Sequence, residues 1–178
     1  MKKKTALILL LVISLITLTA CGSSGASSSS QTEPKKQEEP APQPQYPTAR
    51  FDGTEYEFDE ANKHYDMSFR YSNDWKISGF NETMNLYHGS EENPDFVITL
   101  IDYTGQKISD AVAVLADGTE TSVKEINGTA WTTFDIKAEQ KTNSLYLTEK
   151  GNDLYMVVFQ SDKDMTELQQ VFMENVAF

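Results

Sequence analysis

The feature that most constrains this chain is an apolar leader that ends at the only cysteine. Met1–Lys4 contains three lysines, and the following stretch Ala6–Leu18 is almost entirely apolar. A positively charged start followed by such a run is typical of a secretory signal peptide. A transmembrane helix is the alternative, but it needs about 20 apolar residues, and glycine and serine follow this stretch instead of a basic flank. We therefore predict a signal peptide over residues 1–20.

The last residues of this leader resemble the bacterial lipobox. Leu18, Thr19 and Ala20 supply a branched apolar residue and two small residues immediately before Cys21. The resemblance implies a bacterial lipoprotein: a diacylglycerol on the thiol, and cleavage between Ala20 and Cys21. Two or more acyl chains, including a palmitate-type chain, anchor a protein stably to a bilayer. We therefore expect lipid anchoring on the extracytoplasmic face of the cell membrane; the alternative is an ordinary secreted protein with an unrelated cysteine.

Charge and cysteine content narrow the classes of function. Lipidation of Cys21 would leave the mature domain without a free thiol, which excludes disulfides, thiolate nucleophiles and cysteine-based metal sites. The formal net charge is −12, and removal of the three leader lysines makes it −15. This excess of carboxylates argues against a nucleic-acid partner and against a domain that lies flat on anionic lipid head groups.

Composition divides the rest of the chain into two parts. Residues 21–50 are rich in serine and contain five of the six prolines. Such a segment behaves as a flexible coil and a stiffer proline-rich spacer, so we predict a disordered tether. Residues 51–178 have the size of a single globular domain.

Within the domain, apolar alternation and turn residues predict short strands and two hairpins. Asn127-Gly128 is the dipeptide preferred in a type I′ turn, and Lys150-Gly151-Asn152 is a second turn. The run Leu154–Phe159 is apolar throughout, which predicts a central strand covered on both faces. The other predicted strands are Asp66–Tyr71, Asn85–His88, Phe96–Ile101, Val123–Ile126, Ala130–Phe134 and Leu145–Thr148.

Two helices are predicted. Ser109 has the chemistry of an N-cap for a helix over Asp110–Ala116. Asp164 and Glu167 have the spacing of a capping box at the start of a C-terminal helix. Its apolar stripe, which should pack on the sheet, consists of Met165, Leu168, Phe172 and Val176.

The order of these elements resembles that of PsbP-like domains. Phe69–Trp75 is similar to the family's opening pattern F-x-Y-P-x-x-W, with Ser72 in place of the proline. Glu125–Trp131, Leu154–Phe159 and Phe172–Phe178 are similar to its hairpin, its late central strand and its terminal helix. The resemblance covers residues 66–178 and implies an α+β fold, an antiparallel β-sheet with helices packed on it. It implies no catalytic residues.

No motif for catalysis or metal binding stands out in the sequence. His64 and His88 lie in no nucleophile or zinc pattern, so we expect two lone surface histidines. The carboxylate clusters lack the glycine-containing loop of a calcium site, and we expect solvated acidic loops at Glu55, Glu57, Asp59 and Glu60, at Glu91, Glu92 and Asp95, and at Asp162 and Asp164. Most of the strand aromatics should be core: Trp75, Tyr87, Tyr103, Trp131, Tyr146 and Tyr155.

These observations favour a non-enzymatic binding or interaction module without a cofactor. Its partner would be another envelope protein, a cationic or amphipathic ligand, or another small ligand. Two alternatives remain. An envelope hydrolase would use carboxylates as acid and base, and a small-ligand carrier would need an apolar cavity between sheet and helix.

Overall fold

The computed structural model describes residues 44–79, 81–138 and 140–178. The predicted signal peptide, the lipobox Leu18–Cys21 and tether residues 21–43 lie outside this range. The strands are Thr48–Phe51 (β1), Thr54–Glu57 (β2), Glu60–His64 (β3), Met67–Tyr71 (β4), Lys76–Ser78 (β5), Thr83–Gly89 (β6), Pro94–Thr104 (β7), Ser122–Ile126 (β8), Thr129–Ala138 (β9), Lys141–Lys150 (β10) and Asp153–Ser161 (β11), and the helices are Ile108–Leu115 (α1) and Thr166–Glu174 (α2). Neither helix in this part of the chain has the length and hydrophobicity that a bilayer crossing requires.

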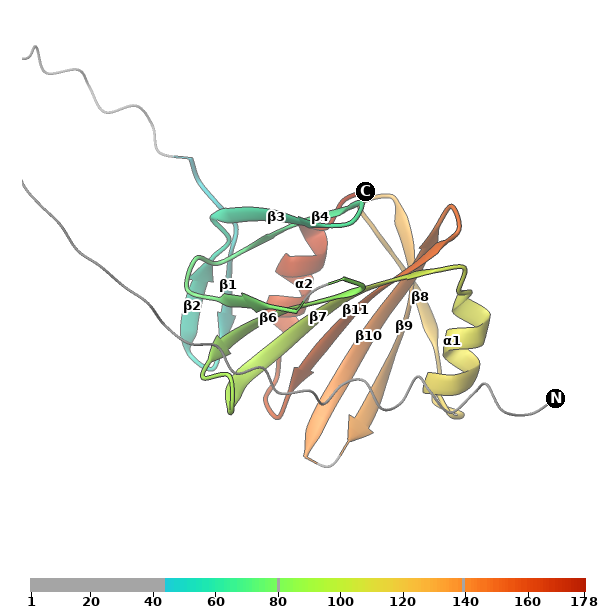
Figure 1. Cartoon of the computed structure of the whole chain (residues 1–178). Coiled ribbons are helices and arrows are strands. Elements are labelled where there is room, and N and C mark those ends of the chain that lie inside the picture. The colour runs from blue at the N-terminus through green and yellow to red at the C-terminus, as the bar shows by residue number, and fades with distance from the viewer. Residues whose placement is uncertain (1–43, 80, 139) are drawn as a thin grey trace, which may run out of the picture. The chain divides into compact units, whose positions relative to one another are not determined.

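A seven-stranded antiparallel sheet dominates the described residues (Figure 1). Its strand order is β5-β6-β7-β11-β10-β9-β8, so β11 lies at the centre and β8 at one edge. The prediction that Leu154–Phe159 forms a covered central strand is confirmed. Leu154 belongs to the core cluster on one face of the sheet, and its neighbour Tyr155 belongs to the cluster on the other.

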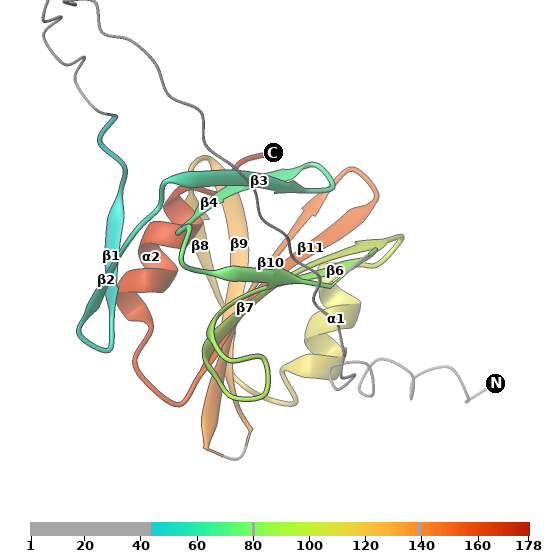
Figure 2. The same ribbon diagram turned by 60° about the vertical axis from the view of Figure 1, so that its left-hand side comes forward.

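The two helices lie on opposite faces of this sheet (Figure 2). On one face, Leu168 and Phe172 of α2 pack into the larger core cluster, which also includes residues of the small hairpins β1–β2 and β3–β4. On the other face, Val112 and Leu115 of α1 pack on a second cluster around Leu147. Strand alternation therefore produces two separate cores, one on each side of the sheet.

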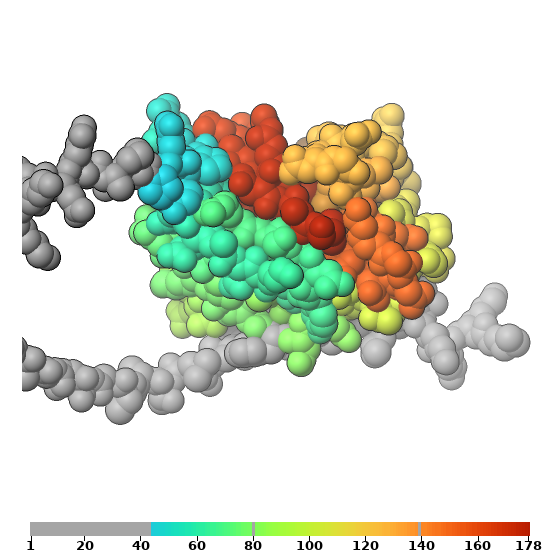
Figure 3. All heavy atoms as spheres, turned by 90° about the horizontal axis from the view of Figure 1, so that it is seen from above, coloured from blue at the N-terminus to red at the C-terminus, as the bar shows by residue number. Residues whose placement is uncertain are grey.

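The C-terminal residues complete the larger core. Ala177 and Ser68 exchange two backbone hydrogen bonds of 2.7 and 2.9 Å, which tie the chain end to β4. Figure 3 shows the red C-terminal residues between the blue-green β3–β4 hairpin and the orange β10–β11 hairpin. The predicted stripe of α2 is confirmed, since Met165, Leu168, Phe172 and Val176 are all buried.

The predicted α+β class is wrong, because the described part of the chain is mainly β. The two helices have only eight and nine residues, whereas β7 alone has 11. Strand β4 matches the predicted strand Asp66–Tyr71, but strands β1 to β3 were not predicted, because polar and charged residues separate their apolar ones. Their buried faces carry well-spaced aromatics such as Phe51, Tyr56 and Phe58. Strand β1 begins at Thr48, within the range predicted for the tether.

Both predicted hairpins are confirmed. Asn127 and Gly128 have φ values of +50° and +70°, as a type I′ turn between β8 and β9 requires. Gly151, with φ of +64°, supplies the positive φ of the turn between β10 and β11. Lys150 is paired with Asp153 and belongs to the strand rather than to the turn.

Helix α1 begins earlier than predicted and has a different cap. Ser109 lies inside the helix, and the backbone N–H of Ile108 donates a hydrogen bond of 2.6 Å to Glu149 Oε1. Glu149 is 41 residues further along the chain, on β10, so local sequence spacing gives no sign of this cap. A carboxylate at this position also interacts favourably with the helix dipole.

Helix α2 keeps one half of its predicted capping box. Asp164 Oδ1 accepts a hydrogen bond of 2.9 Å from the backbone N–H of Thr166. Glu167 does not complete the box, because its Oε1 accepts a 3.1 Å hydrogen bond from the backbone N–H of Arg50. Glu167 therefore links α2 to β1, a contact between residues 117 positions apart.

Candidate binding groove

A groove of about 1360 Å³ runs between α2 and the sheet strands β8, β9 and β10. We call it the α2 groove. The described residues that line it come from the three strands, from the segment before β8, from the β8–β9 turn, from the segment before α2 and from α2 itself. They are Thr119, Glu120, Ser122, Lys124, Glu125, Ile126, Asn127, Thr133, Phe134, Asp135, Thr142, Ser144, Leu145, Tyr146, Asp162, Lys163, Asp164, Met165, Thr166, Gln169, Gln170, Met173 and Glu174.

The hollow exists because small polar residues replace large apolar ones along this face of the sheet. Trp131 fills the face on β9, but the next residue on the same side is Thr133, opposite Ser122 of β8. On β10, Ser144 is the neighbour that precedes Tyr146 on that side. Small side chains leave space where the neighbouring positions carry rings.

Hydroxyl and amide groups line both walls of the groove. Ser122 Oγ and Thr133 Oγ1 lie 2.8 Å apart and share a hydrogen bond across the floor. Tyr146 donates its hydroxyl to Gln169 Oε1 of α2 at 3.4 Å, which connects floor and wall. At the C-terminal end of α2, Asn127 Nδ2 donates a 2.6 Å hydrogen bond to the carbonyl of Glu174. The bonds to Gln169 and Glu174 tie α2 to the sheet and to the β8–β9 turn.

The α2 groove has an excess of negative charge. Two lysines line it, Lys124 and Lys163. The lining carboxylates are Glu120, Asp135, Asp162, Asp164 and Glu174. Glu125 also belongs to the lining, but strand alternation turns its side chain to the other face of the sheet.

Both lysines interact with other protein groups. Lys124 Nζ lies 5.7 Å from the centre of the Tyr146 ring. Lys163 forms an ion pair with Asp52 of the β1–β2 turn, and this hydrogen bond raises the pKa of the lysine. Within the described residues, Asp135 and Asp162 form no hydrogen bond through their side chains and no ion pair.

Two other pKa values describe the environment of the groove. Burial raises the pKa of the Tyr146 hydroxyl, and the nearby Asp135 carboxylate raises it further. The pKa of Asp164 is lowered because its carboxylate accepts two hydrogen bonds from Thr166. The bond from the hydroxyl has the larger effect, and the bond from the backbone N–H has the smaller one. At neutral pH the groove therefore presents an intact tyrosine hydroxyl and an ionised aspartate. It offers hydrogen bonds and a negative field to a ligand.

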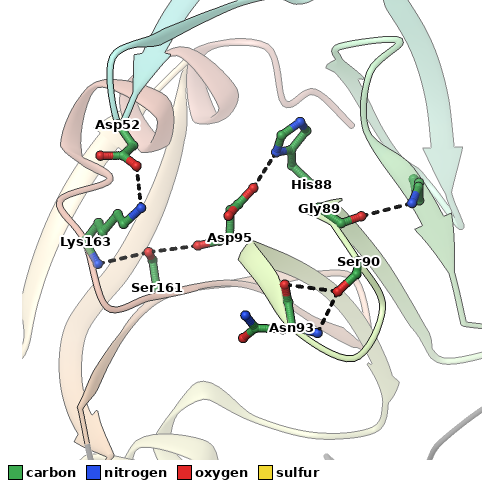
Figure 4. A network of polar contacts seen from close by, with 9 residues as sticks. Asp52, His88, Gly89, Ser90, Asn93, Asp95, Ser161 and Lys163 are labelled. Carbon is green, nitrogen blue, oxygen red and sulfur yellow. Dashed lines mark hydrogen bonds and ion pairs between the residues drawn. The ribbon is translucent and has the colours of Figure 1, made fainter.

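A polar network holds the segment before α2, which forms one end of the groove (Figure 4). His88 Nδ1 lies 2.7 Å from Asp95 Oδ2, and Ser161 Oγ donates a 3.2 Å hydrogen bond to the Asp95 carbonyl. The backbone N–H of Lys163 in turn donates to Ser161 Oγ at 3.0 Å. His88 is partly exposed, as expected, but it is paired with a carboxylate rather than alone.

The expectation of a surface position for His64 is wrong. Its side chain is buried at the end of β3, and its Nε2 lies 3.2 Å from the carbonyl of Glu82. Because a carbonyl can only accept, this geometry requires a proton on Nε2. Burial lowers the pKa of His64, although the Glu82 carbonyl acts in the opposite direction. The contacts of His64 are those of a neutral core histidine.

Asp102 is a buried carboxyl group that the sequence reading missed. Its Oδ1 has no hydrogen-bond partner among the described residues. Burial raises its pKa, and the carboxylates of Asp153, Asp66 and Glu82 raise it further. Asp102 follows Ile98 and Leu100 on the buried face of β7. The predicted strand ended at Ile101, so a prediction extended by one residue would have placed Asp102 on this face.

The predicted acidic loops are distributed over several parts of the surface. Glu55 pairs with Arg50 at 3.1 Å, and Asp59 accepts hydrogen bonds from Asn73, both away from the α2 groove. Asp162 and Asp164 are the members of the predicted clusters that line the groove. Among the described residues, no group of three or more His, Cys, Asp or Glu side chains is placed to hold a metal ion.

The predicted core aromatics are mostly confirmed. Tyr103 is only partly buried and packs beside α1. Tyr146 is buried but still reaches the α2 groove. The remaining four are buried: Trp75, Tyr87, Trp131 and Tyr155.

No protein-family model matches this chain, and neither does the sequence of any curated protein. Among solved structures, a Bacteroides thetaiotaomicron protein is similar over 63% of this chain and 44% of its own, with 16% identity and a TM-score of 0.46. This match therefore spans less than half of that protein. The solution structure of the cyanobacterial PsbP protein CyanoP from Synechocystis sp. PCC 6803 is similar over 63% of this chain and 86% of its own, with 10% identity and a TM-score of 0.46. With TM-scores below 0.5, these likenesses carry no argument about function.

Proposed function

We propose that this protein is a lipid-anchored lipoprotein of the cell envelope whose domain binds a cationic ligand or a partner protein in the α2 groove. The observation that carries the proposal is the groove itself, which is large, polar and rich in carboxylates. The domain acts by binding and not by catalysis.

The anchor follows from the sequence. Cys21, within the lipobox-like Leu18–Cys21, carries the lipid, and residues 21–47, up to the start of β1, extend between the membrane and the domain. About 30 residues of flexible chain have a root-mean-square reach of roughly 30 Å. The domain can therefore meet partners at some distance from the extracytoplasmic face of the membrane.

The size and lining of the groove favour an extended polar partner. Pockets for small molecules usually have volumes of about 300–1000 Å³ and are mainly apolar. The α2 groove is larger, at about 1360 Å³, and hydroxyl, amide and carboxylate groups line it. A polar segment of another protein fits this chemistry better than the apolar cargo of a small-ligand carrier.

Site-specific crosslinking in intact membranes tests this proposal. A photoreactive residue at Thr142, which lines the groove, should capture a partner of defined mass. The matched control is Val114, an exposed position on α1 at the opposite face of the sheet. Capture at Thr142 should fall when Glu120→Gln and Asp135→Asn are introduced together. Equal capture from Val114, or no capture from Thr142, would count against a partner in the groove.

A further inference from the structure

Strand β8 is an open edge of the seven-stranded sheet next to the α2 groove. Within the described residues it pairs with β9 on one side and with no strand on the other. Residues 122–125 are all exposed, and Val123 is 71% exposed. The opposite edge strand, β5, has only three residues, whereas β8 has five. Of the two edges, β8 therefore offers the longer unpaired backbone.

The hairpin register determines which backbone groups of β8 face outward. The two-residue turn makes Ile126 and Thr129 a hydrogen-bonded pair. Hydrogen-bonded and non-bonded pairs alternate along an antiparallel ladder, so Ser122 and Lys124 also direct their backbone groups to β9. The N–H and C=O groups of Val123 and Glu125 therefore point away from the sheet. They form the template on which a further strand can pair.

We propose that an extended cationic segment of a partner protein adds to β8 as a new edge strand and places its basic side chains in the α2 groove. This inference rests on the proposed function and specifies how the partner binds. Addition of a strand to a sheet edge is a general mode of peptide recognition, in which the backbone provides affinity and alternate side chains provide specificity.

Alternation predicts the sequence pattern of this partner. Every second side chain of an added strand lies on the α2 side of the sheet, within reach of the carboxylates that line the groove. Lysine or arginine at these positions complements Glu120, Asp135 and Glu174. The intervening residues lie on the other side, beside the exposed Val123, and should be apolar.

Charge also favours a foreign partner over a second copy of this chain. Two copies joined through β8 would bring two acidic grooves side by side, in a chain whose formal net charge is −12. Like charges at close range oppose association and suppress wrong partners. A basic segment meets the same groove with net attraction, because five lining carboxylates outnumber the two lining lysines.

Binding of a synthetic peptide to the full chain in detergent micelles tests the proposal. The probe is a fluorescent ten-residue peptide of alternating lysine and valine, and fluorescence anisotropy gives its Kd. Val123→Pro removes an outward N–H donor without removing a hydrogen bond to β9, and an edge strand tolerates proline. Val123→Ala is the control, because it keeps the backbone N–H. We expect Val123→Pro to weaken binding about tenfold relative to Val123→Ala, with circular dichroism unchanged.

A second peptide separates strand pairing from charge attraction. It carries the same lysines, but alternate backbone nitrogens are methylated and cannot donate to β8. We expect its binding to be at least about tenfold weaker than that of the parent peptide. Equal binding of both peptides, or equal binding to Val123→Pro and Val123→Ala, would overturn strand addition.

The double variant Glu120→Gln with Asp135→Asn distinguishes failure of strand addition from failure of the proposed function. If both backbone tests show no effect but Glu120→Gln with Asp135→Asn abolishes peptide binding, strand addition is overturned and the groove remains the cationic site. If the double variant binds the parent peptide as tightly as the unchanged protein, the groove is not the cationic site, and the proposed function and the further inference both fail.

Discussion

Asp102 is a buried carboxyl group, one oxygen of which has no hydrogen-bond partner in the described part of the chain, and it should make stability depend on pH. Its folded-state pKa lies above the ordinary value of 3.8 because burial and three neighbouring carboxylates disfavour the ionised form. The folded state therefore binds a proton more tightly than the unfolded state. As pH rises from about 3.8 through the folded pKa, the free energy of unfolding should fall.

Replacement of Asp102 with Asn should remove this dependence. We expect Asp102→Asn to raise the free energy of unfolding at pH 7 by on the order of 1 kcal/mol, the scale of an unpaired buried polar group. Urea unfolding across pH 4 to 8 measures both effects. A variant that is less stable than the unchanged protein at pH 7 would show that the ionised carboxylate has a partner that the geometry does not reveal.

His64 should make the free energy of unfolding change with pH in the opposite direction. Its pKa is below the ordinary value of 6.5 because burial disfavours the charged imidazolium. Below pH 6.5 the unfolded state binds the proton more readily, so the free energy of unfolding should fall as pH decreases through this range. Gln can still donate to the Glu82 carbonyl but does not titrate. In the same unfolding series, His64→Gln should reduce the loss of stability between pH 6.5 and 5; an unchanged slope would contradict a buried neutral histidine.

At the scale of elements, two glycines with positive φ should differ in their tolerance of a side chain. Gly128 in the β8–β9 turn has φ of +70°, and an added Cβ would meet nothing within 4 Å. Gly79 after β5 has φ of +96°, and a Cβ would lie 2.7 Å from the backbone oxygen of Thr83. Backbone cannot move aside as a flexible side chain can. Gly79→Ala should therefore cost more stability than Gly128→Ala.

The expected cost is about 1 kcal/mol for Gly128→Ala, from backbone strain alone. For Gly79→Ala we expect about 2 kcal/mol or more, because steric overlap adds to the strain. Thermal unfolding of the two variants under identical conditions gives the comparison. If the two substitutions cost the same free energy of unfolding, the backbone at the turn between β5 and β6 must be able to move away from an added Cβ at residue 79.

The sequence predicted correctly those elements that are determined by residues close together in the chain. The Asn127-Gly128 turn, the apolar run of β11 and the stripe of α2 depend on residues close in sequence, and the structure confirms them. The Ser109 cap of α1 and the Glu167 half of the α2 capping box were wrong, because Glu149 and Glu167 take partners 41 and 117 residues away. Such pairings arise only when the whole fold has formed.

For the molecule as a whole, anchoring and folding should be separable. Cys21→Ser, in a chain with an ordinary cleavable secretory signal, should release the protein from membranes and leave the unfolding of its domain unchanged. The reason is that lipid attachment requires the thiol. Fractionation with a high-salt wash, followed by thermal unfolding of the released protein, measures both. Retention on membranes would indicate a second membrane contact, and release of an unfolded chain would show that folding requires the anchor.

The candidate site illustrates the limit of sequence reasoning at this scale. The sequence indicated an acidic domain and a cationic or protein partner, but it did not locate the α2 groove. Ser122, Thr133 and Ser144 are unremarkable serines and threonines in sequence. They form a floor only because β8, β9 and β10 pair in register. The α+β class failed for a similar reason, since the small hairpins β1–β2 and β3–β4 are stabilised by contacts with α2 and with the central sheet.

The most direct test of the groove as a binding site is hydrogen exchange of the full chain with and without the lysine–valine peptide. Backbone amides of residues 119–126 and of the segment 162–170 should exchange more slowly when the peptide is bound, because these residues line one edge and one end of the groove. Amides of α1, on the opposite face, should be unaffected. Protection confined to α1, or no protection at a saturating peptide concentration, would contradict binding in the α2 groove.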